Sequence, residues 1–129
     1  MSQKNEKILL QLRDNKPNIT YPNYWSLIGG HVEKNEDLDQ AISREIKEEI
    51  NCIIKGIKYI GEIVQKSNPY HKNGLTLYIF KGKIDKEIEE IDLMEGQKIS
   101  YFTFEEILNL RVPPFLREFI INNKKQIFI

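Results

Sequence analysis

Short apolar runs recur along the chain between polar segments, at a length typical of buried strands. They predict strands at residues 8–12, 52–54, 57–64, 75–81 and 99–104. A shorter apolar segment, 25–28, leads into two glycines. Prolines and asparagines make 14–23 a loop, and the charge-rich stretch 83–94 is expected to be a loop with a short strand. These runs are therefore predicted to form a sheet.

Other segments have the spacing of a helix with one apolar face. Asp37 is a good N-cap, and Gln40 stands where a capping box places Glu or Gln. The stripe that follows consists of Leu38, Ala41, Ile42, Ile46 and Ile50. A short helix is expected at 105–110. After two prolines, a C-terminal helix is expected over 115–125, with these side chains inward: Phe115, Phe119 and Ile120.

Length, composition and charge narrow the class of protein. The 129 residues suit one domain, 1–129, and the interleaved elements predict an α/β fold with helices on a mixed sheet. Acidic and basic residues balance at 19 each, which gives no general attraction to nucleic acid or a membrane surface. A single cysteine excludes an internal disulfide, and from the polar N-terminal residues and the short apolar runs we expect neither a signal peptide nor a membrane-spanning segment. We expect a cytoplasmic protein with a small-molecule partner; a homodimer stays open.

Carboxylates gather in one stretch, residues 29–51, which contains a single arginine, Arg44. On a helix, Glu45 and Glu49 share a face one turn apart, and Glu48 lies at its edge. Arg44 can pair with Glu48 but cannot neutralise all three. Two interpretations follow: a solvated helix surface of mixed charge, or a site for Mg²⁺ or Mn²⁺, which prefer oxygen ligands.

The spacing to the preceding residues favours the metal site. Gly30 is followed by Glu36 after five residues, then after seven more by Arg44-Glu45-Ile46, any residue, Glu48-Glu49. This register matches the Nudix signature in six identities, which average composition would bring together in about 1 in 10⁵ chains of this size. The chain therefore resembles a Nudix hydrolase. The segments ILLQLR, WSLIGG and MEGQKISYF also look like parts of MutT-type nucleotide pyrophosphohydrolases.

The resemblance implies a Nudix α/β/α sandwich with a mixed sheet, a loop-helix-loop and a C-terminal helix. It implies a metal site for Mg²⁺ or Mn²⁺ whose ligands match the carbonyl of Gly29 and the carboxylates of Glu45, Glu48, Glu49 and Glu95. Arg44 matches an arginine that orients these carboxylates, and Glu36 would support the loop before the helix. One of the ligand carboxylates would also be the general base, and the sequence leaves open which one.

The implied reaction is hydrolysis of a phosphoanhydride bond in a nucleoside diphosphate linked to a group X. We expect a nucleoside triphosphate as substrate, with a monophosphate and pyrophosphate as products. One alternative is a module that binds nucleotide or ADP-ribose without cleaving it. Another is a family isomerase that acts on a prenyl diphosphate. This isomerase needs a reactive cysteine, whereas Cys52 begins a predicted buried strand.

Candidate substrate-binding residues lie outside the helix, apart from Gly30 in the signature itself. Arg13, at the end of a predicted strand, is either a nucleotide contact or a surface charge. Trp25 either stacks on a base or packs in the core, and His71 either reaches a phosphate or is solvated. Glu95, in Glu-Gly-Gln, matches a further carboxylate of MutT-type enzymes, or it is a surface turn residue.

Three positions depart from the family pattern. Asn51 replaces a glycine at the helix end, where Asn tolerates the left-handed backbone. Leu116 stands where members that read 8-oxoguanine carry asparagine, which speaks against that specificity. The family's first strand is apolar, but residues 1–6 are polar here. Either this strand is very short, or the chain start is abbreviated, or another subunit covers the edge. We expect the sheet edge beside Ile8–Leu12 to be capped in an atypical way.

Overall fold

A computed structural model describes residues 2–4, 6–29, 35–66 and 74–128. Its strands are β1 (Ser2–Lys4), β2 (Lys7–Leu12), β3 (Trp25–Ser26), β4 (Ile54–Gln65), β5 (Leu75–Ile84) and β6 (Lys98–Phe102). Its helices are α1 (Leu38–Ile50), α2 (Phe104–Leu108), α3 (Pro114–Asn122) and α4 (Lys124–Phe128), with a 3₁₀ helix, η1 (Ile88–Glu90). Within the described ranges, no helix has the length and apolar character needed to cross a membrane.

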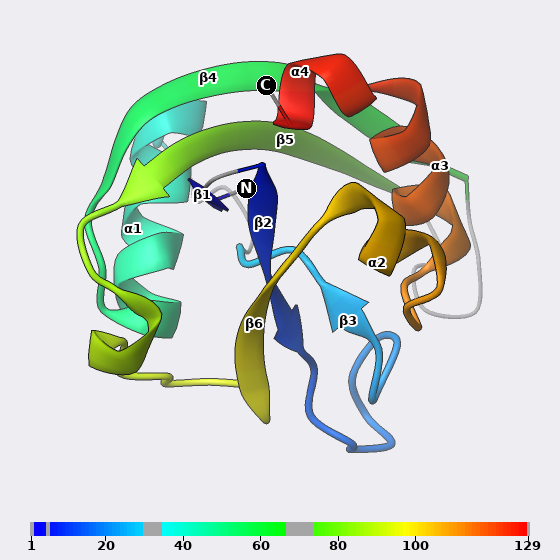
Figure 1. Cartoon of the computed structure of the whole chain (residues 1–129), viewed down its shortest axis with the longest axis horizontal. Coiled ribbons are helices and arrows are strands. Elements are labelled where there is room, and N and C mark those ends of the chain that lie inside the picture. Colours follow the sequence, from blue (N-terminus) through cyan, green and yellow to red (C-terminus); the bar gives the residue numbers. More distant parts are fainter. Residues whose placement is uncertain (1, 5, 30–34, 67–73, 129) are drawn as a thin grey trace.

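Strand β2 lies at the centre of the fold (Figure 1). On one edge it pairs antiparallel with β6, from Ile8 opposite Phe102 to Leu12 opposite Lys98. Its other edge is shared by β1 and the two-residue strand β3. Strand β1 also pairs in parallel with β5, and β5 pairs antiparallel with β4. The sheet is therefore mixed, as the sequence predicted.

The first strand is formed within the chain, so the expected atypical cap at this edge is wrong. Strand β1 is only three residues long and pairs from Ser2 opposite Leu9 to Lys4 opposite Lys7. Glu6, with a positive φ of 63°, lies in the tight turn that follows. Polar residues suffice here because the ladder is made by backbone groups, which every residue except proline supplies in full.

The longest strands of the sheet, β4 and β5, pair antiparallel and curve across the upper part of the molecule in Figure 1. The predicted strands 52–54 and 57–64 are largely one strand, because a bulge at Gly56, with φ +63°, keeps β4 continuous. Strand β5 runs on to Ile84. No further strand follows in the described stretch 85–97, where η1 replaces the short strand we expected. The Glu87 backbone N–H donates to the Glu90 side chain and stabilises this turn.

Two hydrophobic clusters fill the two faces of the sheet. Ile8 and Leu10 point into the cluster beneath α2, α3 and α4, whereas Leu9, between them, points into the cluster beneath α1. Figure 1 shows α1 and α3 on opposite sides of β2. The arrangement is the α/β/α sandwich predicted from the sequence.

Both ends of α1 agree with the sequence prediction, whereas the C-terminal helix ends earlier than predicted. Asp37 caps α1, and the reciprocal bonds with Gln40 complete the predicted capping box. Asn51 ends the helix in the left-handed conformation, with φ 51°. The C-terminal helix, however, breaks at Asn123, whose side chain and backbone N–H both donate to the Phe119 carbonyl, at 2.9 and 3.0 Å. Ile120 is fully buried, and the predicted inward residues Phe115 and Phe119 are partly buried.

Candidate active site

The arginine of α1 binds three carboxylates at once. Its Nε and Nη2 donate to the two oxygens of Glu36 at 2.8 and 3.1 Å. Nη1 donates to Glu45 at 2.7 Å and to Glu48 at 3.1 Å. The Glu36 and Glu45 side chains are 13% and 14% exposed, so solvent screens these pairs less than it screens a surface pair. Arg44 thus fixes the carboxylates and links α1 to the segment before it.

Glu49 lies among further acidic groups. Burial, together with the nearby Glu95 and Glu45 carboxylates, raises the pKa of Glu49 from its usual 4.5 to about 7. The Arg13 side chain opposes the shift, and Glu48 adds to it. The negative charge at this place is therefore incompletely compensated by the protein.

The loop 94–97 brings Glu95 to this place from a distant part of the chain. The Met94 backbone N–H donates to the Glu49 carbonyl at 2.9 Å, and the Gln97 N–H donates to the Leu12 carbonyl at 2.8 Å. Between them, the Gln11 side chain donates to the Glu95 carbonyl. The loop is therefore attached to both α1 and β2.

The acidic side chains suit a hard divalent cation by their chemistry, because all of them offer oxygen. In the described part of the chain, however, no three acidic, histidine or cysteine side chains form a ready-made ligand group. Arg44 occupies an oxygen of both Glu45 and Glu48. Gly29, the expected carbonyl ligand, is half-buried just before the described segment ends.

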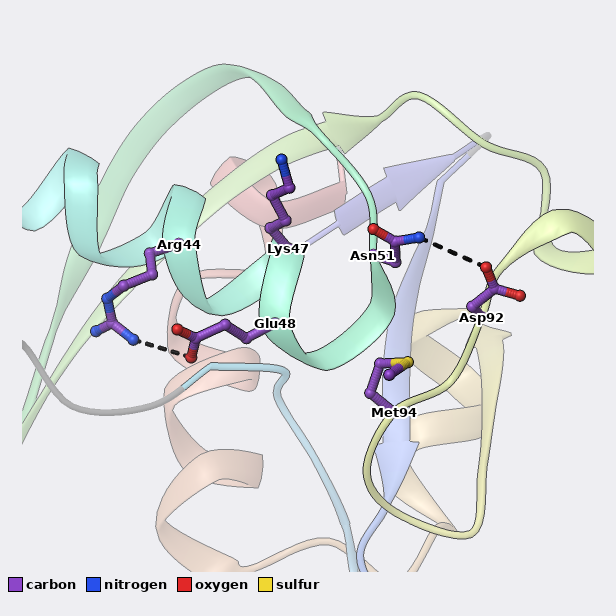
Figure 2. Close-up of a pocket in the computed structure, with 6 residues that line it drawn as sticks. All are labelled: Arg44, Lys47, Glu48, Asn51, Asp92 and Met94. Atoms are coloured by element: carbon purple, nitrogen blue, oxygen red, sulfur yellow. Dashed lines mark hydrogen bonds and ion pairs between the residues drawn. The ribbon is translucent and has the colours of Figure 1, made fainter.

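An open groove of about 810 Å³ runs beside these carboxylates. One wall of the groove is formed by residues three or four positions apart along the C-terminal half of α1 and its cap. The segment after η1 forms the opposite wall (Figure 2). Its lining consists of Arg44, Lys47, Glu48, Asn51, Asp92 and Met94. Met94 is 63% exposed, so the groove offers an apolar surface next to charged groups.

The other predicted residues fall into different environments. Arg13 donates from Nε to the Thr20 carbonyl at 2.7 Å and is close enough to Glu49 to affect its pKa. Trp25 packs edge-to-face on Phe102, with ring centroids 4.8 Å apart, and lies against the larger core cluster. Gly30 and His71 lie outside the described residues.

Two further residues bear on interpretations from the sequence. Burial raises the pKa of the Cys52 thiol, which donates to the Ile50 carbonyl at 3.3 Å, so the reactive cysteine of an isomerase is not found here. Sequence reasoning missed Gln11, which it included in an apolar run. A polar residue at the centre of such a run was the available signal, because buried polar groups need a partner.

Comparison with known proteins gives a consistent result. Residues 1–122 match the family model of the NUDIX domain. Among solved structures, the MutT protein of Methanosarcina mazei has a TM-score of 0.76 at 21% identity, over 93% of this chain and 84% of that one. The MutT NUDIX hydrolase of Burkholderia pseudomallei also has 0.76, at 17% identity, over 93% and 90%.

A third similar structure is the NUDIX domain of Shewanella oneidensis NrtR, solved in complex with ADP-ribose. Its TM-score is 0.70 at 15% identity, over 93% of this chain and 76% of that one. At these identities, the three structures show that the fold is shared.

Proposed function

The chain belongs to the Nudix family and is a pyrophosphohydrolase, and we propose that it converts a nucleoside triphosphate to a monophosphate and pyrophosphate with Mg²⁺ or Mn²⁺. The observation that carries the proposal is the acidic cluster around Glu49, whose charge the protein compensates incompletely. A structural helix surface has no need to collect carboxylates against their mutual repulsion.

The residues that would hold the ion are the carbonyl of Gly29 and the carboxylates of Glu45, Glu48, Glu49 and Glu95. A bound divalent ion would neutralise phosphate charge and lower the pKa of an attacking water. Arg44 holds Glu45 and Glu48 in place. One carboxylate of the set would take the proton from water.

The groove beside α1 is our proposed nucleotide site. Its volume, about 810 Å³, falls within the range common for small-molecule sites. Lys47 offers a positive charge to a phosphate, and Met94 offers an apolar surface to a base. Leu116 is 1% exposed and packs in the core, so it does not contact a base, which supports a substrate other than 8-oxoguanine nucleotides.

A second candidate function is binding of nucleotide or ADP-ribose without cleavage. The similarity to a domain solved with ADP-ribose agrees with that candidate.

A product assay separates the two. The protein is incubated with Mg²⁺, Mn²⁺ or EDTA and a panel of nucleoside triphosphates, ADP-ribose, nucleotide sugars and dinucleoside polyphosphates. A monophosphate and pyrophosphate from one triphosphate, absent with EDTA and in Glu49→Gln, support the proposal. Saturable calorimetric binding of ADP-ribose or a nucleotide, with no product from any compound, supports the binding module instead.

A matched set of glutamine variants assigns the carboxylates. Glu45→Gln, Glu48→Gln, Glu49→Gln and Glu95→Gln each remove one charge at constant shape. The variant whose loss of kcat most exceeds its loss of Mn²⁺ affinity identifies the general base, whereas a carboxylate that serves only as a ligand should lose its share of kcat through the weaker Mn²⁺ binding.

A further inference from the structure

One polar side chain is buried in the central strand. Gln11 is 4% exposed, and it is the one buried polar residue among those that the structure describes. Because side chains alternate along a strand, Gln11 lies on the same face as Leu9, toward α1 and the acidic cluster. Burying an amide is unfavourable unless it is hydrogen-bonded. Its Nε2 donates to the Glu95 carbonyl, 84 residues away in sequence.

The same side chain packs against Gly96. This glycine has φ +84°, and a Cβ built there would lie 2.7 Å from Nε2 and 2.8 Å from Cγ of Gln11. No other residue type fits this close approach without displacing Gln11 or the loop. The amide of Gln11 and the absence of a side chain at Gly96 are therefore complementary.

The neighbouring bonds hold the loop on both sides of this contact. The Gln97 backbone N–H donates to the Leu12 carbonyl at 2.8 Å, and its side chain donates to the Arg13 carbonyl at 2.8 Å. On the other side, the Met94 N–H donates to the Glu49 backbone carbonyl at 2.9 Å. The Gln11 bond fixes the peptide between these anchors, which is the peptide that carries the Glu95 side chain.

We propose that Gln11 is a positioning residue, which acts through Glu95 by fixing the loop 94–97 so that the Glu95 carboxylate faces Glu49 on α1. The catalytic consequence rests on the proposed function, in which both carboxylates serve the metal site. Gln11 itself does not contact substrate or metal. A glutamine with a merely structural role would fill space in β2 but would have no specific link to Glu95.

A double-mutant cycle tests this link. Gln11→Met keeps the shape of the side chain but removes the donor. We expect it to lower kcat about 10-fold, as loss of an outer support of a metal site does, with little change in the KM for nucleotide. In a Glu95→Gln background, the same substitution should lower kcat less than about 2-fold, because the residue it positions is already inactive.

Leu10→Met is the matched control. It alters the preceding residue of β2, which is fully buried on the opposite face, and removes no side-chain hydrogen bond. Its effect should be small and equal in both backgrounds. Equal fold losses from Gln11→Met in the two backgrounds would overturn the proposal and leave Gln11 a purely structural residue.

A second measurement does not depend on turnover. Amide hydrogen exchange of the metal-free protein reports the Met94 and Gln97 N–H groups directly. We expect Gln11→Met to speed exchange at both amides at least about 10-fold, while amides inside α1 keep the wild-type rate. Leu10→Met should leave both amides unchanged. Unchanged exchange in Gln11→Met would refute the positioning role.

Mn²⁺ affinity separates this inference from the proposed function. If the wild-type protein cleaves no nucleotide, the proposed reaction fails. The cycle is then measured as the Mn²⁺ dissociation constant, and Gln11→Met should weaken binding about 10-fold only when Glu95 is intact. Equal weakening in both backgrounds, or none in either, counts against the inference whether or not the protein is an enzyme.

Discussion

Arg44 donates from two nitrogens to the two oxygens of Glu36, at 2.8 and 3.1 Å, and so joins the middle of α1 to the segment that precedes it. The remaining guanidinium nitrogen turns toward Glu45 and Glu48. Only a planar guanidinium supplies this set of donors in a fixed geometry. Two carboxylates of the candidate site, Glu45 and Glu48, are therefore held in place before any cation binds.

Arg44→Lys should be severely impaired although it keeps the charge. An ammonium group cannot donate in parallel to Glu36 and also reach the two other carboxylates. We expect kcat/KM to fall at least about 10-fold and the Mn²⁺ dissociation constant to rise by a similar factor. Steady-state kinetics and a Mn²⁺ titration measure both. Lys55→Arg, at an exposed position on β4 outside the groove, is the control for a basic exchange, and wild-type kinetics in Arg44→Lys would contradict the role we give this residue.

The metal-free protein should lose stability as the pH rises. The pKa of Glu49 is about 7 in the folded protein, above its usual 4.5, so the folded state binds more protons than the unfolded state between these values. The stability contributed by the protonated group is fully present below about pH 4.5 and is lost as the pH passes through about 7. In EDTA, Tm should therefore fall from pH 5 to pH 8 more steeply in the wild type than in Glu49→Gln.

Adding Mn²⁺ at pH 8 should raise the wild-type Tm, because the ion compensates the charge on Glu49 and its neighbours. Glu62→Gln, an exposed position on β4, is the control and should follow the wild type in both buffers. Parallel pH curves for the wild type and Glu49→Gln would show that this carboxylate has an ordinary environment.

Gly96→Ala should disturb the site more than an alanine at a comparable glycine. The added Cβ meets the Gln11 side chain at 2.7 to 2.9 Å, at a φ of +84°. We expect a loss of about 2 kcal/mol in the free energy of unfolding, from left-handed strain and overpacking together, and at least about a 10-fold lower kcat. Chemical denaturation and kinetics provide the two values.

Gly56→Ala is the matched control, because Gly56 has φ +63° but no atom within 4 Å of a built Cβ. It carries the backbone strain without the overlap. Its kcat should therefore equal that of the wild type, and an equal activity loss in both variants would argue against the contact with Gln11.

Lys47→Ala should weaken substrate binding without slowing the chemical step. Lys47 lines the groove through α1 and is exposed, so its attraction for a phosphate is screened by water. We expect KM for the triphosphate to rise about two- to five-fold at constant kcat, an effect that diminishes with added salt. Lys55→Ala, on β4, is the control. A large drop in kcat instead would place Lys47 closer to the reacting phosphate than the groove implies.

Local features of the fold could be predicted from the sequence. The Asp37–Gln40 capping box and the left-handed Asn51 depend on a few neighbouring residues, and both are found. The sequence did not predict that β1 pairs with β2 within the chain, because this pairing uses backbone groups and leaves no apolar pattern in residues 1–6. The break at Asn123 also went unpredicted, since no proline or glycine marks it in the sequence.

The candidate site also has one part that the sequence predicts and another part that it does not. The carboxylates of α1 follow from their spacing, whereas the contact of Gln11 with the loop 94–97 joins residues far apart in sequence. No local pattern announces such a pair. Its one indication was an amide in an apolar strand, and its partner appears only once the strands have been paired.

The alternation along β2 ties folding to activity. Ile8 and Leu10 belong to one hydrophobic cluster, and Leu9 and Gln11 face the other. A slip of one residue in the pairing of β2 would exchange these sets and turn Gln11 away from Glu95. Such a misfolded chain could remain compact and still be inert. Every molecule that regains full activity after refolding is therefore one in which β2 found its correct register.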